Sequence, residues 1–226
     1  MSAVPADIGF EDAVGESGLE PELPRRATFY FWIVVAAATA ATAPFLVDIQ
    51  TVDAGAWITF AVLGAAVAVA QVFVVVTPAN QSYHTTVVFL VASALLLPPE
   101  LIALMAVVQH VPDWLKRRLP FHIQTFNIAN YTLATMAAAA AADGIRDTEV
   151  FGRLGATTAC AYLAACGAFV LVNHALLAPM LRFARGHTLR ESGLFTYENL
   201  STDLVLASLG VGLASLWHYE IGRAHV

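Results

Sequence analysis

The sequence predicts an all-α, polytopic membrane helix bundle. Apolar residues make up 58% of the 226 positions, charged residues make up 12%, and the mean hydropathy is +0.69. Soluble domains carry about 25% charged residues, so this composition indicates an integral membrane protein. From Thr28 onward, apolar runs alternate with short polar breaks. A bilayer core of about 30 Å needs about 20 helical residues per crossing, and runs of roughly this length recur along the chain.

We expect about seven transmembrane helices. The predicted crossings cover residues 28–47, 56–76, 83–97, 99–111, 122–142, 153–180 and 200–219. The third and fourth are short and are divided by Pro98 and Pro99. A single helix kinked at these prolines is the alternative, because proline removes a helical hydrogen bond and bends the axis.

The distribution of charge favours two separate helices at this point. Cytoplasmic loops of membrane proteins are enriched in Lys and Arg, and seven crossings place all the clustered basic residues on one side. These residues are Arg25, Arg26, Lys116, Arg117, Arg118, Arg182, Arg185 and Arg190. The opposite loops carry Asp48, Asp53, Glu100, Asp143, Arg146, Asp147 and Glu149, with Arg153 at the edge of the next predicted helix. One kinked helix would move the cluster at Lys116 to the acidic side. We therefore expect a protein of the inner (plasma) membrane with a cytoplasmic N-terminus.

Both ends of the chain differ from its apolar middle. Residues 1–27 hold a cluster of acids and three prolines, which predicts a disordered acidic cytoplasmic tail rather than a signal peptide. Residues 28–220 form the expected transmembrane domain. The last six residues, 221–226, read IGRAHV, which resembles the translation of a common sequencing-library adapter. We therefore expect that the natural reading frame was cut at about Glu220, and the family resemblance described below implies that an eighth helix was lost with the rest of the chain.

Several classes of protein are excluded by composition. The 17 acids outnumber the 11 Lys and Arg residues, so no basic face for nucleic acid is expected. Cys160 and Cys166 are six positions apart on one apolar segment and point to different sides of a helix, which predicts neither a disulfide bond nor a metal site. The histidines, including His84, His122 and His218, are scattered singly, so no metal or other cofactor is expected.

Polar side chains at membrane depth mark the candidate site, since such groups are costly there and usually face protein or water. The fifth predicted helix carries Gln124, Asn127, Asn130 and Tyr131, and the sixth carries Asn173 and His174. One interpretation is an amide-rich pocket for a small polar ligand. The other is interhelical hydrogen bonding without a ligand. His174 and His122 are also candidates for sensing pH, because imidazole titrates near neutrality.

Asp203 lies close to the start of the last apolar segment. The simpler interpretation places it in the first turn of a helix, where acids are favoured by the helix dipole. Ser201 or Thr202 would then help to cap the helix, and Arg185 or Arg190 would pair with the acid. The alternative is an ion or proton site.

Small residues recur as stripes on several predicted helices. Runs rich in Ala, Thr and Gly cover 36–43, 134–142 and 156–168, and small side chains let helix backbones approach closely in lipid. They predict a compact bundle. On the last predicted helix, Gly210 and Gly212 are expected to face a groove left by the lost partner helix.

Three segments resemble the multi-helix membrane input regions of bacterial signalling proteins. They are VPDWLKRRLPFHIQTFNIANYTLA (111–134), FVLVNHALLAPMLRFARGHTLRESGLF (169–195) and TYENLSTDLVLASLGVGLASLW (196–217). In that family such segments precede an eighth helix and a cytoplasmic GGDEF diguanylate cyclase or HD-type phosphohydrolase domain. This chain has no GGDEF loop, His-Asp pair of the HD type or EAL motif, so no catalytic residue can be assigned to it.

Two classes of function remain. The first is a sensory input domain that passes a helix movement to a missing output domain, and the second is a small-solute transporter or substrate-binding membrane subunit. The lipid bilayer is the expected partner, and no nucleic acid is expected. A homodimer and a small-molecule ligand of unknown identity are left open.

Overall fold

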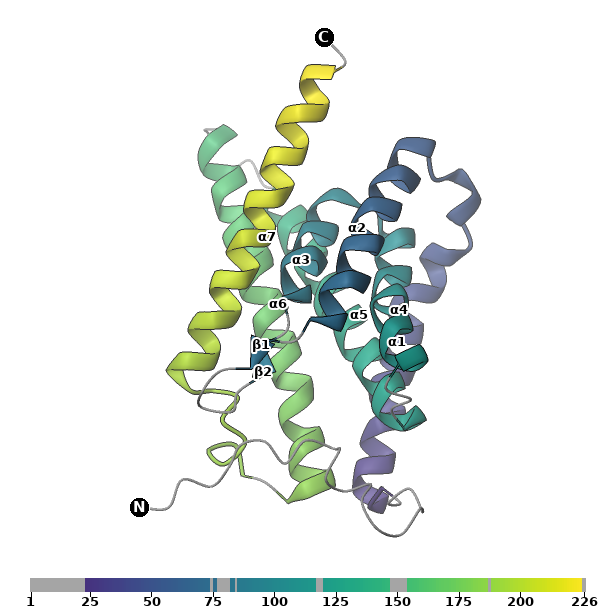
Figure 1. Cartoon of the computed structure of the whole chain (residues 1–226), viewed down its shortest axis with the longest axis vertical. Helices are drawn as coiled ribbons and strands as arrows, with labels where there is room; N and C mark the ends of the chain where they lie inside the picture. Colours follow the sequence, from purple (N-terminus) through teal and green to yellow (C-terminus); the bar gives the residue numbers. More distant parts are fainter. Residues whose placement is uncertain are drawn as a thin grey trace.

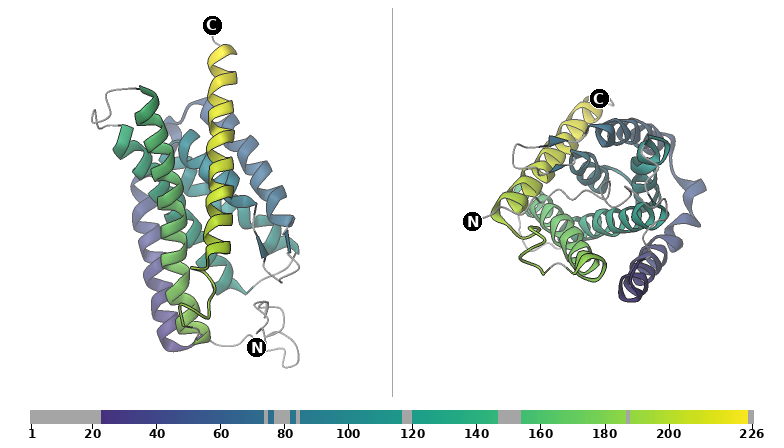
Figure 2. Two further views of the ribbon diagram at one scale, coloured as in Figure 1. Left: turned by 90° about the vertical axis from the view of Figure 1, so that its left-hand side faces the viewer. Right: turned by 60° about the horizontal axis from the view of Figure 1, so that its bottom comes forward.

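The computed structural model describes residues 23–73, 75–76, 82–83, 85–116, 120–146, 154–186 and 188–224. This part of the chain forms seven α-helices: α1 (Arg25–Leu46), α2 (Ala54–Val72), α3 (Thr86–Leu96), α4 (Pro99–Lys116), α5 (Phe121–Arg146), α6 (Leu154–Arg185) and α7 (Tyr197–Ala224). A 3-10 turn, η1 (Ile49–Thr51), follows α1. Strands β1 (Val75–Val76) and β2 (Ser82–Tyr83) lie between α2 and α3. Successive helices run in alternating directions along the bundle (Figures 1 and 2).

The helix count confirms the prediction, including the separation of the third and fourth helices. Leu97 leaves the helical conformation, with φ −105° and ψ 147°, as expected for a residue that precedes a proline. Pro99 then begins α4, at the first helical position, where its missing N–H is not needed. Because the chain reverses at this break, α4 runs back alongside α2 and α3.

The described basic clusters lie at one end of the bundle, as predicted, although that end also carries Glu191 and Glu198. The end that holds the N-terminus of α1, named here the basic end, carries Arg25, Arg26, Lys116, Arg182, Arg185 and Arg190. The opposite end carries Asp48, Asp53, Glu100, Asp143 and Arg146, and Arg146 pairs with Asp143 at 3.1 Å. Arg117, Arg118, Asp147 and Glu149 lie outside the described residues.

The shortest helix is the most deeply buried. In α3 every residue from Leu90 to Leu95 is buried, because the helix is apolar on all sides and packs against α2, α5 and α7. A helix without a polar face needs neighbours all round it. A second, smaller core joins α1, α5 and α6 around Phe31 and Phe126 at the basic end.

Small residues bring the helices together, as predicted. Ala134, Ala138 and Ala142 follow one another at a spacing of four on α5 and are fully buried, and α5 and α6 form the most extensive helix pair of the bundle. On α7, Gly210 is buried against α3: a Cβ atom at this position would lie 2.5 Å from the carbonyl oxygen of Val88. The expected groove at Gly210 is therefore filled by α3, whereas Gly212 is exposed.

Several boundaries differ from the predicted ones. The chain leaves α2 at Val72 and forms β1 where the sequence analysis continued the helix to Val76. The run VFVVV explains this, since β-branched residues favour extended backbone. The hairpin is antiparallel, with Val75 opposite Tyr83 and Val76 opposite Ser82. At the other end of the domain, α4 continues to Lys116 instead of ending at Val111, which places Asp113 inside a helix.

The expected terminal segments are only partly described. Residues 1–22 of the acidic tail lie outside the described residues, and α1 already begins at Arg25. The helix α7 continues to Ala224, so residues 221–224 extend it, while 225–226 are outside the described part. The adapter origin of 221–226 stays a prediction.

Four of the described helices are long and apolar enough to cross a membrane. They are α1, α2, the segment Ala156–Arg185 of α6 and the segment Tyr197–Tyr219 of α7. The helix α3 is apolar but has only 11 residues, which corresponds to about 16 Å at 1.5 Å per residue. Large apolar side chains are exposed along all four long helices, among them Ile33, Ile58, Leu171 and Val205.

Candidate functional site

The first group of buried polar side chains joins α2, α3 and α4. We name it the amide cluster and define it by Gln71, Thr86, Gln109 and Asp113, all of which are buried. The Gln71 amide nitrogen donates to the Asp113 carboxylate, and the Gln109 amide nitrogen donates to Gln71 Oε1 at 3.0 Å and to Thr86 Oγ1 at 3.3 Å. Gln109 and Asp113 are four residues apart and therefore share one face of α4.

The amide cluster retains unused hydrogen-bonding capacity. Gln109 is fully buried, and its Oε1 atom has no hydrogen-bond partner in the structure. A buried amide oxygen without a partner costs about 1–3 kcal/mol. Burial of a polar group at such a cost is a common feature of sites that bind or switch.

His110 connects α4 to its neighbours beside the amide cluster. Its Nδ1 atom lies 2.8 Å from the carbonyl oxygen of Ala106 and must carry the proton in that contact, because a carbonyl can only accept. The Gln124 amide nitrogen donates to the backbone carbonyl of His110 at 2.9 Å. Gln124 therefore ties α5 to α4, which is the interhelical role that the sequence left open for it.

The second group lies between α6 and α7. The Nε2 atom of His174 is 2.7 Å from Oδ2 of Asp203; the side chain of His174 is 3% exposed and that of Asp203 is 22% exposed. The ring of Phe195 packs edge-on against the imidazole, with 5.7 Å between the ring centroids. The Nδ1 atom of His174 is buried and has no hydrogen-bond partner in the structure.

This pair, named here the His–Asp pair, can exist in two states that differ by one proton. With a neutral imidazole, Nε2–H donates to the carboxylate; with a protonated imidazole, the same contact is an ion pair and Nδ1–H becomes a second donor. In a low-dielectric interior the two states differ in how strongly they hold α6 to α7. In either state the contact between His174 and Asp203 joins α6 to α7.

An aromatic contact joins α4, α5 and α6 beside the amide cluster. The ring of Tyr131 on α5 lies 5.8 Å from the ring of His110 on α4 and 6.5 Å from that of Phe169 on α6. Tyr131 therefore links the helix that carries Gln109 and Asp113 to the helix that carries His174.

The structure brings some predicted site residues together and separates others. Asn130 and Asn173 meet between α5 and α6, where the Asn130 amide nitrogen donates to Asn173 Oδ1 at 2.7 Å. Asn127 is half-buried and makes no side-chain hydrogen bond to another described residue. Gln124 points to α4 rather than to this amide pair. The ligand-binding role of these residues stays a prediction.

Asp203 differs from its simpler interpretation. It pairs with His174 rather than with Arg185 or Arg190. The hydroxyls of Ser201 and Thr202 donate to the carbonyl oxygen of Glu198, so they lie inside the helix. The cap of α7 is Thr196, whose Oγ1 accepts from the backbone N–H of Asn199 at 3.4 Å.

The sequence analysis missed the amide cluster. Gln71 lies in an apolar run as one isolated amide, and Asp113 lies beyond Val111, where the fourth helix was expected to end. The spacing of Gln109 and Asp113 could have revealed the cluster. The two residues are four apart, so they share one helical face once the helix continues through Pro112.

Within the described ranges, no group of three or more His, Cys, Asp or Glu side chains is placed to hold a metal ion. Cys160 and Cys166 are free, and His84 lies outside the described residues.

No family model, curated protein or solved structure matches the chain. The functional argument therefore depends on the site itself.

Proposed function

We propose that the chain is a membrane-embedded input domain of a bacterial signalling protein, which senses a chemical signal and passes a helix movement to a cytoplasmic output domain. The observation that carries this proposal is the His–Asp pair, in which His174 is buried and Asp203 is partly buried. It joins α6 to α7 near the basic end, where residues 186–196 connect the two helices, residue 187 lying outside the described part. A change in the hydrogen bond between His174 and Asp203 would directly alter how α7 is held against α6.

The proposed membrane location has three supports. Four described helices are long and apolar enough to cross a bilayer. The described basic clusters lie at one end of the bundle, and cytoplasmic loops of membrane proteins are enriched in basic residues. Exposed aromatic rings also occur near both ends, with Trp32 and Trp114 towards the basic end and Trp57 and Tyr219 towards the other. Such rings favour the membrane interfaces. The basic end would face the cytoplasm of a bacterium, and the seven helices would cross its inner membrane.

The proposed switch works by a shift between two packings of α7. Outside the His–Asp pair, α7 packs mainly on α3 through small residues, so its position depends on few polar contacts. A signal that binds one packing better than the other shifts the population toward it. Couplings of about 1–3 kcal/mol correspond to shifts of about 5–150-fold, which is the range that one buried polar pair can supply.

The proposed output is a GGDEF diguanylate cyclase, with an HD-type phosphohydrolase as the related form, as the sequence resemblance implies. Sequencing the genomic region that encodes this chain tests the proposal. An apolar segment followed in frame by either soluble domain supports it. A stop codon soon after codon 220 contradicts it.

In the full-length protein, Asp203→Asn should abolish or lock the response of the output activity to its signal while membrane insertion is unchanged. Asp143→Asn is the matched control, because it removes the same charge from an exposed pair at the opposite end. If Asp203→Asn responds like the unaltered protein, the pair is not the switch.

Labelling of single cysteines tests the orientation. In a variant without Cys160 and Cys166, a cysteine at Asp53 should react with an impermeant thiol reagent in intact cells, and one at Arg185 should react only after permeabilisation. Labelling of position 185 in intact cells would reverse the proposed topology.

A small-solute carrier is the second candidate, and the amide cluster favours it. The cluster lies where α2 ends and α3 begins, at the other end of α3 from the break at Pro98. The interruption beside the cluster is the one between α2 and α3, where β1 and β2 lie, and interrupted helices often form transport sites. The genomic test separates the two candidates, since a carrier needs no soluble output domain.

A further inference from the structure

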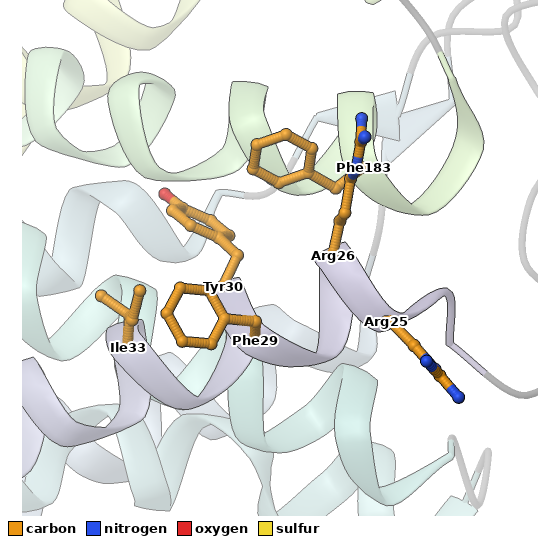
Figure 3. Close-up of a pocket in the computed structure, with 6 residues that line it drawn as sticks. All are labelled: Arg25, Arg26, Phe29, Tyr30, Ile33 and Phe183. Atoms are coloured by element: carbon orange, nitrogen blue, oxygen red, sulfur yellow. The ribbon is translucent and has the colours of Figure 1, made fainter.

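An open groove lies at the basic end between the first turns of α1 and the last turns of α6. It has a volume of about 470 Å³ and is lined by Arg25, Arg26, Phe29, Tyr30, Ile33 and Phe183. Figure 3 shows Tyr30 and Phe183 next to each other, with their rings in edge contact. The groove is not part of the amide cluster or of the His–Asp pair.

The wall of the groove is held in place by the core behind it. The hydroxyl of Tyr30 donates to the carbonyl oxygen of Leu176 at 2.9 Å. The Tyr30 ring packs edge-on against Phe183 at 5.7 Å and lies 6.4 Å from the ring of Phe126. A groove with a fixed wall can bind a ligand without first ordering its own side chains.

The opposite side of the groove is apolar and open to the surroundings. Phe29 is 71% exposed and Ile33 is 48% exposed, and they follow one another along α1 at a spacing of four, which puts them on one face. In the proposed membrane location this face meets lipid chains.

The mouth of the groove is positively charged. Arg25 and Arg26 are both exposed there, and the first turn of α1 contains no acid. The last turn of α6 adds Arg182 and Arg185 at the same end of the bundle. The N-terminus of α1 contributes a further partial positive charge. Basic residues directly above an apolar groove complement a molecule with an anionic head and an apolar chain.

We propose that this groove binds one anionic phospholipid of the cytoplasmic leaflet, with its phosphate at the mouth on Arg26, whose side chain lies beside Phe183 (Figure 3), and an acyl chain along Phe29, Ile33 and Phe183. Arg25 points away from Phe183 and adds positive charge at the same mouth without sharing the phosphate contact. The inference rests on the proposed membrane location. Its chemistry is that of the basic pockets between transmembrane helices that bind acidic headgroups. The occupant is a lipid rather than a free anion, because Phe29, Ile33 and Phe183 below the arginines form an apolar surface. An acyl chain can pack on this surface, whereas a small anion gains no contact from it.

Native mass spectrometry of the purified chain in detergent tests the proposal. Dioleoylphosphatidylglycerol should bind in a saturable 1:1 complex, and dioleoylphosphatidylcholine should not. Arg25→Gln with Arg26→Gln should weaken binding by about 30-fold, since each cation near the headgroup contributes about 1 kcal/mol and 1.4 kcal/mol is tenfold. The control that removes the same charge elsewhere is Arg146→Gln with Arg190→Gln, and it should bind like the unaltered chain.

A second variant separates the groove from the general attraction of charge. Ile33→Trp keeps all the arginines, and because Ile33 is half-exposed the larger ring should enter the groove without disturbing the core. This variant should lose the 1:1 complex. Normal binding by Ile33→Trp, or equal losses in both arginine pairs, would overturn the proposal and leave only bulk attraction between arginines and acidic lipid.

Two further outcomes are decisive. If inorganic phosphate or glycerol 3-phosphate at millimolar concentration displaces the lipid, the arginines bind a free anion and the proposal is wrong. Extraction of cell membranes with alkaline carbonate tests the membrane location separately. A chain released by carbonate contradicts the proposed function, whereas a retained chain without a 1:1 complex contradicts only the lipid site.

Discussion

Replacing Gly210 by alanine should destabilise the bundle. The new Cβ atom would lie 2.5 Å from the carbonyl oxygen of Val88 and 3.0 Å from Cβ of Val91, both on α3. The first contact involves backbone, which cannot rotate away, so α7 must move off α3. Overpacking of this kind costs about 1–3 kcal/mol, and the displaced helix also loses dispersion contacts along its length.

Gly212→Ala is a closely matched control. It lies two residues further on the same helix, is exposed, and a Cβ atom there meets nothing within 4 Å. Both substitutions gain about 0.5–1 kcal/mol of helix propensity. The difference between the two variants therefore isolates the overpacking term of about 1–3 kcal/mol.

Thermal unfolding in detergent measures this difference. Cys166 is buried in the same core as Val91, so in a Cys160→Ala background a thiol-reactive fluorogenic dye reports when the core opens. At about 2–4 °C per kcal/mol for a domain of this size, Gly210→Ala should melt several degrees below Gly212→Ala. Equal melting temperatures would refute the close approach of α3 and α7.

The same assay checks three further variants. Asp203→Ala should lower the unfolding free energy by about 1–3 kcal/mol, because the buried Nε2–H of His174 loses its acceptor. Asp203→Asn keeps an acceptor oxygen, so it should lower the unfolding free energy by less. Gln71→Leu should cost a similar amount, since it removes both the donor to Asp113 and the acceptor of the neighbouring amide, and an unchanged melting temperature would mean that these bonds are replaced by water. Tyr30→Phe should cost at most about 0.5–1.5 kcal/mol, because the carbonyl group that it contacts lies inside a helix.

The number and direction of the helices could be predicted because two independent patterns agree. Apolar runs set the length of each helix, and the position of each basic cluster fixes the parity of the helices before it. The break at Pro98 was ambiguous by hydropathy alone. The cluster at Lys116 decided it correctly, because one helix fewer would have placed that cluster at the acidic end.

The hairpin after α2 and the extension of α4 could not be predicted from hydropathy. Valine is apolar in a helix and in a strand, so the run that ends at Val76 reads as membrane helix by hydropathy although its β-branched side chains favour extended backbone. Pro112 gave the opposite error. It marked a helix end, but the helix continues through it to Lys116. Both errors were local, and neither changed the order of the helices.

The partners of buried polar residues are the part of the site that sequence could not supply. Helical spacing shows which residues share a face but not which helix lies opposite that face. Asn173 and His174 are adjacent on α6, so their side chains leave the helix about 100° apart. Asn173 contacts Asn130 on α5, and His174 contacts Asp203 on α7. That α6 would lie between those two helices is a property of the bundle and not of the sequence around either residue.

The arrangement of polar groups gives the proposed switch a physical basis. The amide cluster holds α2, α3 and α4 together, and Gln124 and the Asn130–Asn173 bond add α5 and α6. These contacts are between neutral groups or involve a carboxylate that accepts from an amide, so they do not depend on a proton at His174. The hydrogen bond between His174 and Asp203 does depend on the proton at His174, and it joins α7 to α6. In the proposed switch, a signal that acts on His174 would therefore move α7, while the other polar contacts keep α2 to α6 in place.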